Sequence, residues 1–216
     1  MNEALPAQEE ILHNLQSDRQ QALATYFQAA TPRLRRIAGF RLDYRVSGRV
    51  SESDVIQETF VRAARNLDHF LAQPDMPFFV WLRLELSQKL QELHRYHLDS
   101  LKRDARRERS LGGVVGAAAN AGGQTSLAIA ARLVANQTSP SRLVERAEQI
   151  ANLEKTLSEL PELDQEIIAL RHFEELTNLE TAQVLGIDPS AASKRYLRAL
   201  QHLKEMMSSL ESRNES

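Results

Sequence analysis

The chain has 216 residues, of which 42% are hydrophobic, so it can bury a core and is neither a disulfide mini-protein nor a disordered tail. It contains no cysteine, which excludes disulfides, thiolate zinc sites and cysteine nucleophiles, and its formal charge of −2 indicates no general affinity for a polyanion. Only 8 glycines and 7 prolines occur, where average usage predicts about 26 together, and this scarcity disfavours a many-stranded β fold and favours long helices and an all-α fold, in one or two small helical domains. The first ten residues lack the basic and apolar regions of a secretory signal, so we expect a cytoplasmic protein.

Apolar residues recur at helical spacing through the first half of the chain. Residues 52–66 carry a clear helix signal, because Ser51 or Ser53 can accept hydrogen bonds from the first backbone N–H groups and acidic residues lie in the first turn. The segment FLAQPDMPF holds two prolines, which predicts an irregular loop before a second long helix from about residue 78 to residue 96. The first half is therefore expected to be a helical bundle.

No charged residue occurs over residues 111–131, a length that could cross a bilayer. Five of the eight glycines fall in this stretch together with several polar residues, so its hydrophobicity and helix propensity are both low. We interpret residues 111–140 as a flexible linker and expect no membrane insertion. Residues 1–19, an N-terminal extension, and the tail 208–216 are expected to fray.

Beyond the linker, a spaced apolar stripe is interrupted at Pro161, which predicts two successive helices. Thr177 and Glu180 then have the spacing of a capping box, so a short helix is expected to begin there. Gly186 suits the left-handed conformation at which a helix ends, and Pro189 suits the first position of the next helix. A short helix, a tight turn and a long helix form the helix-turn-helix pattern of DNA-binding proteins.

The second helix of this motif has the layout of a recognition helix. Short polar side chains in its first turn can approach base edges, and the cations behind them can neutralise phosphates. The residues expected to contact DNA are Ser190, Ser193, Lys194, Arg195 and Arg198. An ordinary amphipathic hairpin with a solvated basic face is the alternative, and the caps, the turn and the basic face together favour DNA binding.

Two motifs of the chain resemble those of one protein family. DVIQETFVRA, residues 54–63, resembles the D-x-x-Q-E-x-F-x-R-A signature with which bacterial sigma-70 factors bind the clamp helices of core RNA polymerase, and the helix-turn-helix resembles region four of that family. Their order, with no third domain between them, is similar to that of extracytoplasmic-function (ECF) sigma factors. The resemblance implies a region-two-like domain over 20–110 for the polymerase and the minus-10 element, and a region-four-like domain over 141–207 for the minus-35 element.

The resemblance also implies roles for residues of the first domain. The contacts that it implies with core polymerase are made by Asp54, Gln57, Glu58 and Phe60. In isolation, D-x-x-Q-E is better interpreted as a solvated acidic helix, and the second motif decides against that interpretation. The resemblance extends over the loop, the F-x-x-W-L helix after it and the basic segment that follows. It implies minus-10 contacts by Gln73, Asp75, Met76, Trp81, Arg95, Lys102 and Arg103. Burial in the core is an open alternative for Trp81.

Several positions depart from the family pattern. The usual Ile-Ala pair four residues beyond the tryptophan is Glu85-Leu86 here, and the usual Asn is Gln88. The common Gly before the helix-turn-helix is Glu175. The promoter preference is therefore not predicted.

The resemblance implies a non-enzymatic, dissociable subunit that gives core RNA polymerase its promoter specificity, melts the minus-10 region and initiates transcription. The implied partners are the clamp helices and flap of the polymerase and promoter DNA; no cofactor or metal is implied, and binding of an anti-sigma protein is left open. The alternative is a helix-turn-helix regulator whose first half senses a ligand or dimerises, which leaves DVIQETF without a role. An enzyme is a more distant alternative, because the sequence contains no metal cluster, phosphate loop or nucleophile constellation.

Overall fold

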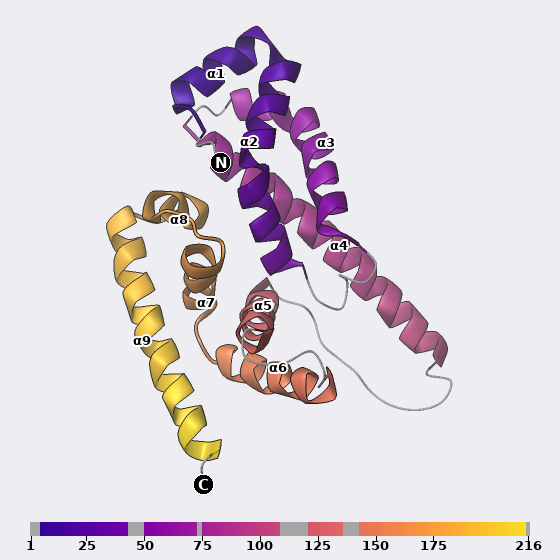
Figure 1. Cartoon of the computed structure of the whole chain (residues 1–216), viewed down its shortest axis with the longest axis vertical. Helices are drawn as coiled ribbons and strands as arrows, with labels where there is room; N and C mark the ends of the chain where they lie inside the picture. Colours follow the sequence, from indigo (N-terminus) through magenta and orange to yellow (C-terminus); the bar gives the residue numbers. More distant parts are fainter. Residues whose placement is uncertain (1–4, 43–49, 73–74, 109–120, 136–142, 215–216) are drawn as a thin grey trace. The chain divides into compact units, whose positions relative to one another are not determined.

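The computed structural model describes residues 5–42, 50–72, 75–108, 121–135 and 143–214 (Figure 1). All of the regular elements in these ranges are helices, which confirms the predicted all-α fold class. The chain divides into two compact units, Met1–Ala117 and Ala118–Ser216. The division falls inside the segment 111–140, which we interpreted as the linker.

Within the described residues, the first unit is a bundle of four helices, α1 (Gln8–Ser17), α2 (Arg19–Arg41), α3 (Glu52–Leu71) and α4 (Phe78–Glu108) (Figure 1). Helices α2, α3 and α4 all contact one another, and α1 packs on α2. Each helix contributes an apolar stripe to one core, whose largest fully buried side chains are Leu15, Leu34, Ile37, Phe70, Phe78, Leu82 and Leu86. The predicted bundle thus forms from amphipathic helices, as the spacing of the apolar residues indicates.

Helix α3 begins where its sequence predicts. The hydroxyl of Ser51 accepts a hydrogen bond from the backbone N–H of Asp54, and the carboxylate of Asp54 accepts one from the backbone N–H of Ser51. This reciprocal capping box satisfies two N–H groups that a helix leaves without internal partners. The helix runs past the predicted end at residue 66 to Leu71.

The N-terminal residues form a packed helix, so the predicted fraying of residues 1–19 is wrong for α1. Ile11 and Leu15 are 2% and 0% exposed. The side-chain amide of Asn14 donates a hydrogen bond to the hydroxyl of Tyr26 on α2, at 2.5 Å. The segment is mostly polar, and its order depends on these two apolar side chains. Burying each of them against the bundle stabilises the helix by about 2 kcal/mol.

An aromatic cluster fills the end of the bundle at which α3 ends and α4 begins. The rings of Phe70 and Trp81 stack with centroids 4.5 Å apart, and Phe78 packs edge-on against Phe70 at 5.7 Å. Trp81 is only 4% exposed. Aromatic contacts of this kind add about 0.5–1.5 kcal/mol to the area that they bury, so this cluster anchors the start of α4.

The second unit contains a helix in the segment that we interpreted as linker. Residues Ala121–Ala135 form α5, which packs on α6 (Leu143–Leu157) and α7 (Glu162–Ile168). Leu127, Ile129 and Ala130 of α5 are at most 7% exposed, so apolar burial compensates for low intrinsic helix propensity. The linker interpretation is therefore wrong for this helix, and the rest of 111–140 lies outside the described residues. No helix in the described ranges is long and apolar enough to span a membrane.

The predicted helix-turn-helix is confirmed in the second unit. Helix α8 (Asn178–Leu185) begins with the expected capping box between Thr177 and Glu180, and Gly186 ends it in the left-handed conformation with φ of 63°. Helix α9 (Pro189–Asn214) begins at the predicted proline and continues through residues 208–214, which we expected to fray. The Ser208 hydroxyl donates a hydrogen bond to the Lys204 carbonyl one turn earlier, at 3.0 Å. Asn178 of α8 also donates to the carbonyl of Pro189, at 2.8 Å.

A five-residue π-helix, η2 (Ala169–Phe173), follows α7 and leads into a loop with a strained position. Glu175 has a φ of 55°, in the left-handed region that L-residues other than glycine rarely adopt. It stands where the family commonly has glycine. The guanidinium of Arg171 donates to the carbonyl of Leu176 at 2.8 Å, which helps to hold the loop in this conformation.

The substitution Glu175→Gly is expected to stabilise the second unit by about 0.5–1 kcal/mol, because glycine relieves the left-handed strain and loses only part of that gain to chain entropy. The measurement is native-state hydrogen exchange of the slowest α7 amides in the full chain. Glu205→Gly, in the interior of α9, is the matched control and should instead destabilise α9 by about 1 kcal/mol. Slower exchange in wild type than in Glu175→Gly contradicts the assignment of strain.

Candidate functional site

Helix α3 presents a polar face to solvent. Asp54, Gln57 and Glu58 are all exposed, as their spacing predicts. Phe60 is only partly exposed, because its ring packs edge-on against Phe27 of α2 with centroids 5.1 Å apart. Val61, an apolar residue of the segment DVIQETFVRA, is 46% exposed. The structure therefore adds an apolar side chain to the exposed face of α3.

Asp54 already has a structural role. Its Oδ2 accepts hydrogen bonds from the backbone N–H of Ser51 at 3.0 Å and from the Ser51 hydroxyl at 2.7 Å. These hydrogen bonds lower the pKa of the Asp54 carboxyl below its usual value. The carboxamide of Gln57 and the carboxylate of Glu58, by contrast, are not part of a helix cap.

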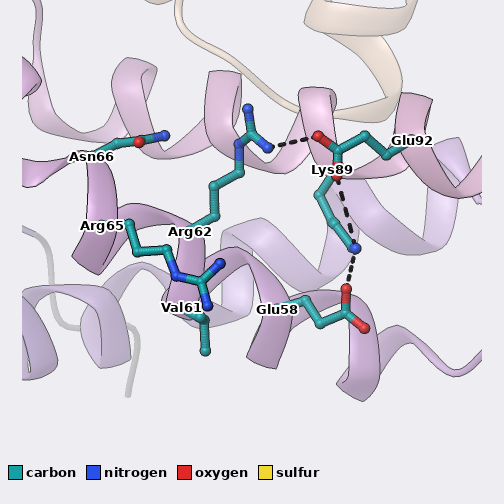
Figure 2. Close-up of a pocket in the computed structure, with 7 residues that line it drawn as sticks. All are labelled: Glu58, Val61, Arg62, Arg65, Asn66, Lys89 and Glu92. Atoms are coloured by element: carbon teal, nitrogen blue, oxygen red, sulfur yellow. Dashed lines mark hydrogen bonds and ion pairs between the residues drawn. The ribbon is translucent and has the colours of Figure 1, made fainter.

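A groove of about 390 Å³ lies between α3 and α4, next to this face (Figure 2). Lys89 of α4 forms an ion pair with Glu58 and lies 3.9 Å from the carboxylate of Glu92. The side chain of Glu58 remains 53% exposed. The residues that line the groove are Glu58, Val61, Arg62, Arg65, Asn66, Lys89 and Glu92.

Arg62 of α3 lines this groove and links α3 to α4. Its Nε donates to the carboxylate of Glu85 at 2.7 Å, and its Nη1 donates to the carboxylate of Glu92 at 2.7 Å (Figure 2 shows the second contact). Its Nη2 also donates to the Gln88 side chain, and Asn66 donates to Glu85 at 2.9 Å. The side chain of Glu85 is only 7% exposed, so Arg62 neutralises a carboxylate that water scarcely reaches.

Our sequence prediction missed Arg62 and Lys89 as parts of the site. One signal was present: Glu85, Gln88 and Glu92 recur at helical spacing on one side of α4. Glu85 and Gln88 are two of the departures from the family pattern, and both contact Arg62. These two departures therefore share one contact.

The predicted minus-10 residues fall into different environments. Asp75 and Arg95 are exposed and Met76 is partly exposed, so each can reach a ligand. Trp81 is buried, and its indole N–H has no hydrogen-bond partner among the described residues. Its predicted DNA contact is not compatible with this conformation, which instead matches the core alternative. Gln73 lies outside the described residues, and so do the side chains of Lys102 and Arg103, whose backbone belongs to α4.

The recognition helix α9 exposes most of the predicted DNA contacts. Ser190, Ser193, Lys194 and Arg198 are exposed. Arg195 differs, because its Nη1 forms an ion pair with Asp164 of α7 at 2.9 Å and its side chain is 39% exposed. This pair links α9 to α7 and fixes the direction of the guanidinium. Leu197, 67% exposed, is an apolar neighbour that our prediction did not include.

Comparisons with known proteins agree with this geometry. A family model described as Sigma-70, region 4 matches residues 150–203. The RNA polymerase sigma factor CnrH of Cupriavidus metallidurans is 31% identical over 155 residues, which cover 71% of this chain and 72% of CnrH. The ECF RNA polymerase sigma factor SigW of Bacillus subtilis is 24% identical over 177 residues, which cover 79% of this chain and 83% of SigW. The chain belongs to the ECF group of sigma-70 factors.

The fold of this sigma factor is also found in a solved structure. The structure of CnrH in complex with the cytosolic domain of CnrY matches with a TM-score of 0.53 and 22% identity, over 94% of this chain and 99% of the solved one. The family model begins within α6 and ends within α9, so it includes α7, η2 and α8. In this sigma factor the first part of the recognition helix, residues 189–203, therefore lies within the family match.

Proposed function

We propose that this sigma factor binds core RNA polymerase through the exposed face of α3 and directs the enzyme to promoters. One observation carries the proposal: Gln57 and Glu58, the central residues of the polymerase-binding signature, are exposed beside a groove whose walls α3 and α4 hold together. A surface of charged residues around an exposed valine suits a protein partner, because aliphatic contact contributes affinity and charge gives specificity.

The two units would then divide promoter recognition. The exposed Ser190, Ser193, Lys194 and Arg198 of α9 would read the minus-35 duplex in the major groove. Asp75, Met76 and Arg95 of the first unit would contact the opened minus-10 strand. The net charge of −2 is consistent with DNA binding in the presence of polymerase. A factor that binds DNA with polymerase attached needs little affinity for DNA of its own.

The remaining proposals follow from the family. We propose a non-enzymatic subunit that acts in the cytoplasm, where transcription occurs. The solved neighbour is CnrH bound to the cytosolic domain of CnrY, and a comparable protein partner is proposed for this sigma factor.

The test is reconstitution. Purified sigma factor is mixed with core RNA polymerase, and the mixture is assayed for complex formation and for transcription from genomic fragments. The proposal expects a stable complex and discrete transcripts that depend on the sigma factor. Failure to bind core polymerase, together with a dimeric footprint on palindromic DNA, would instead support the alternative of a helix-turn-helix regulator.

Replacing Arg198 by alanine is expected to weaken minus-35 binding by about 1 kcal/mol and to reduce the salt dependence of binding by about one released counterion, because Arg198 is an exposed phosphate ligand. The measurement is holoenzyme binding to promoter DNA over a series of salt concentrations. Lys204→Ala, an exposed cation two turns further along α9, is the control and should leave both quantities unchanged. An unchanged salt dependence for Arg198→Ala contradicts the assignment.

A further inference from the structure

The first helix of the chain contacts the backbone of the minus-10 segment. The side-chain amide of Gln8 donates a hydrogen bond from Nε2 to the carbonyl of Met76 at 2.9 Å. Its Oε1 accepts one from the backbone N–H of Phe78, also at 2.9 Å. The two bonds join positions that are 68 and 70 residues apart in the chain.

These two bonds satisfy the backbone carbonyl of Met76 and the backbone N–H of Phe78. Phe78 is the first residue of α4, and its N–H is one of the four that a helix cannot satisfy internally. The carbonyl of Met76 lies just before the helix, where no helical donor reaches it. A glutamine amide offers one donor and one acceptor in a fixed geometry, so a single side chain satisfies both groups.

Helix α1 is itself held firmly, so Gln8 can fix the position of the backbone groups that it binds. Ile11 and Leu15, one and two turns further along α1, are almost completely buried. Phe78, which receives the contact, is 1% exposed and packs edge-on against Tyr26 of α2 at 6.1 Å. The backbone of residues 76–78 is therefore held between the aromatic cluster on one side and α1 on the other. The side chain of Asp75, immediately before this segment, is exposed, and that of Met76 is partly exposed.

We infer that Gln8 is a positioning residue for minus-10 recognition: it fixes the backbone of Met76 and Phe78, and thereby the direction in which Asp75 and Met76 meet the opened DNA strand. The inference rests on the proposed function, since it assigns the strand contact to these residues. Pre-organising a binding segment reduces the entropy lost when the ligand binds, so loss of the two hydrogen bonds should weaken strand capture and leave polymerase binding intact.

The experiment compares three full-length variants. Gln8→Leu removes both hydrogen bonds at similar volume. Gln8→Glu keeps the acceptor for the Phe78 N–H, places a negative charge at the N-terminus of α4, where the helix dipole favours it, and loses the donor. Gln16→Leu makes the same change as the first variant at an exposed position of α1 and is the matched control.

Two quantities are measured. The first is hydrogen exchange of the Phe78 amide, which is expected to be about tenfold faster in Gln8→Leu and close to wild type in both Gln8→Glu and Gln16→Leu. The second is the affinity of each holoenzyme for a single-stranded oligonucleotide that carries the minus-10 element of a promoter used by the wild-type holoenzyme. Gln8→Leu should bind the strand about tenfold more weakly and core polymerase within about twofold of wild type, with Gln8→Glu intermediate for the strand.

If Gln8→Leu exchanges the Phe78 amide faster but binds the DNA strand as tightly as Gln16→Leu does, the inference is overturned. Gln8 is then a helix cap alone. An equal loss of strand and polymerase binding in both Gln8 variants also overturns it, since that result reports general unfolding. Failure of the wild-type chain to bind polymerase overturns the proposed function itself, and it is detected before any variant is made.

Discussion

Replacing Gln57 and Glu58 together by alanine is expected to weaken the binding of this sigma factor to core polymerase about 100-fold, because a few central residues carry most of the energy of an interface. Both side chains are exposed on α3, so the change removes contacts to the partner without opening a cavity. The measurement is competition between labelled wild-type sigma factor and the unlabelled variant for core polymerase.

Glu58 also pairs with Lys89, and the experiment has to separate this internal contact from the external one. Exchanging the two residues, in the double variant Glu58→Lys with Lys89→Glu, keeps an internal ion pair and reverses the charges on the surface. It should remain folded and still bind polymerase poorly. Removal of the same residue types from α1, in Glu10→Ala with Gln16→Ala, is the matched control. Affinity close to wild type for the alanine pair contradicts the proposed interface.

Replacing Arg62 by methionine is expected to lower the free energy of unfolding of the first unit by about 2–3 kcal/mol, because it leaves the scarcely exposed carboxylate of Glu85 without its guanidinium. The hydrogen bond from Asn66 to Glu85 remains and limits the loss. Urea unfolding of the full chain measures it through the fluorescence of Trp81. This residue is the single tryptophan of the sequence and lies in the first unit, so the signal reports that unit.

Removing the buried charge as well should restore stability. In the double variant Arg62→Met with Glu85→Leu, the scarcely exposed carboxylate is gone, while the partly exposed Glu92 remains near Lys89, and we expect recovery of most of the lost free energy. Glu92→Gln serves as a control, because the Glu92 side chain is 44% exposed and its loss should cost less than about 1 kcal/mol. An unfolding midpoint of Arg62→Met equal to that of wild type contradicts the proposed role of the ion pair.

The features that could be predicted from the sequence are those decided within a few residues. The capping boxes at Ser51 and Thr177 and the left-handed Gly186 depend on backbone groups at most four positions away. The exposure of Gln57 and Glu58 follows from helical periodicity alone. The helix-turn-helix and the polar face of α3 were therefore predictable without any knowledge of the tertiary contacts.

The features that only the tertiary structure decided depend on residues far apart in the chain. Helix α5 lies in a glycine-rich segment with little helix signal of its own, and both α5 and α1 are stabilised by the apolar side chains that they bury. Arg62 meets its partners 23 to 30 residues away, and Arg195 meets Asp164 across 31 residues. Local propensity acts over one or two helical turns, whereas burial and ion pairing depend on which surfaces the folded chain brings together. The sequence by itself therefore determined the helices and the exposed residues of the candidate interfaces, and the tertiary structure decided what holds those residues in place.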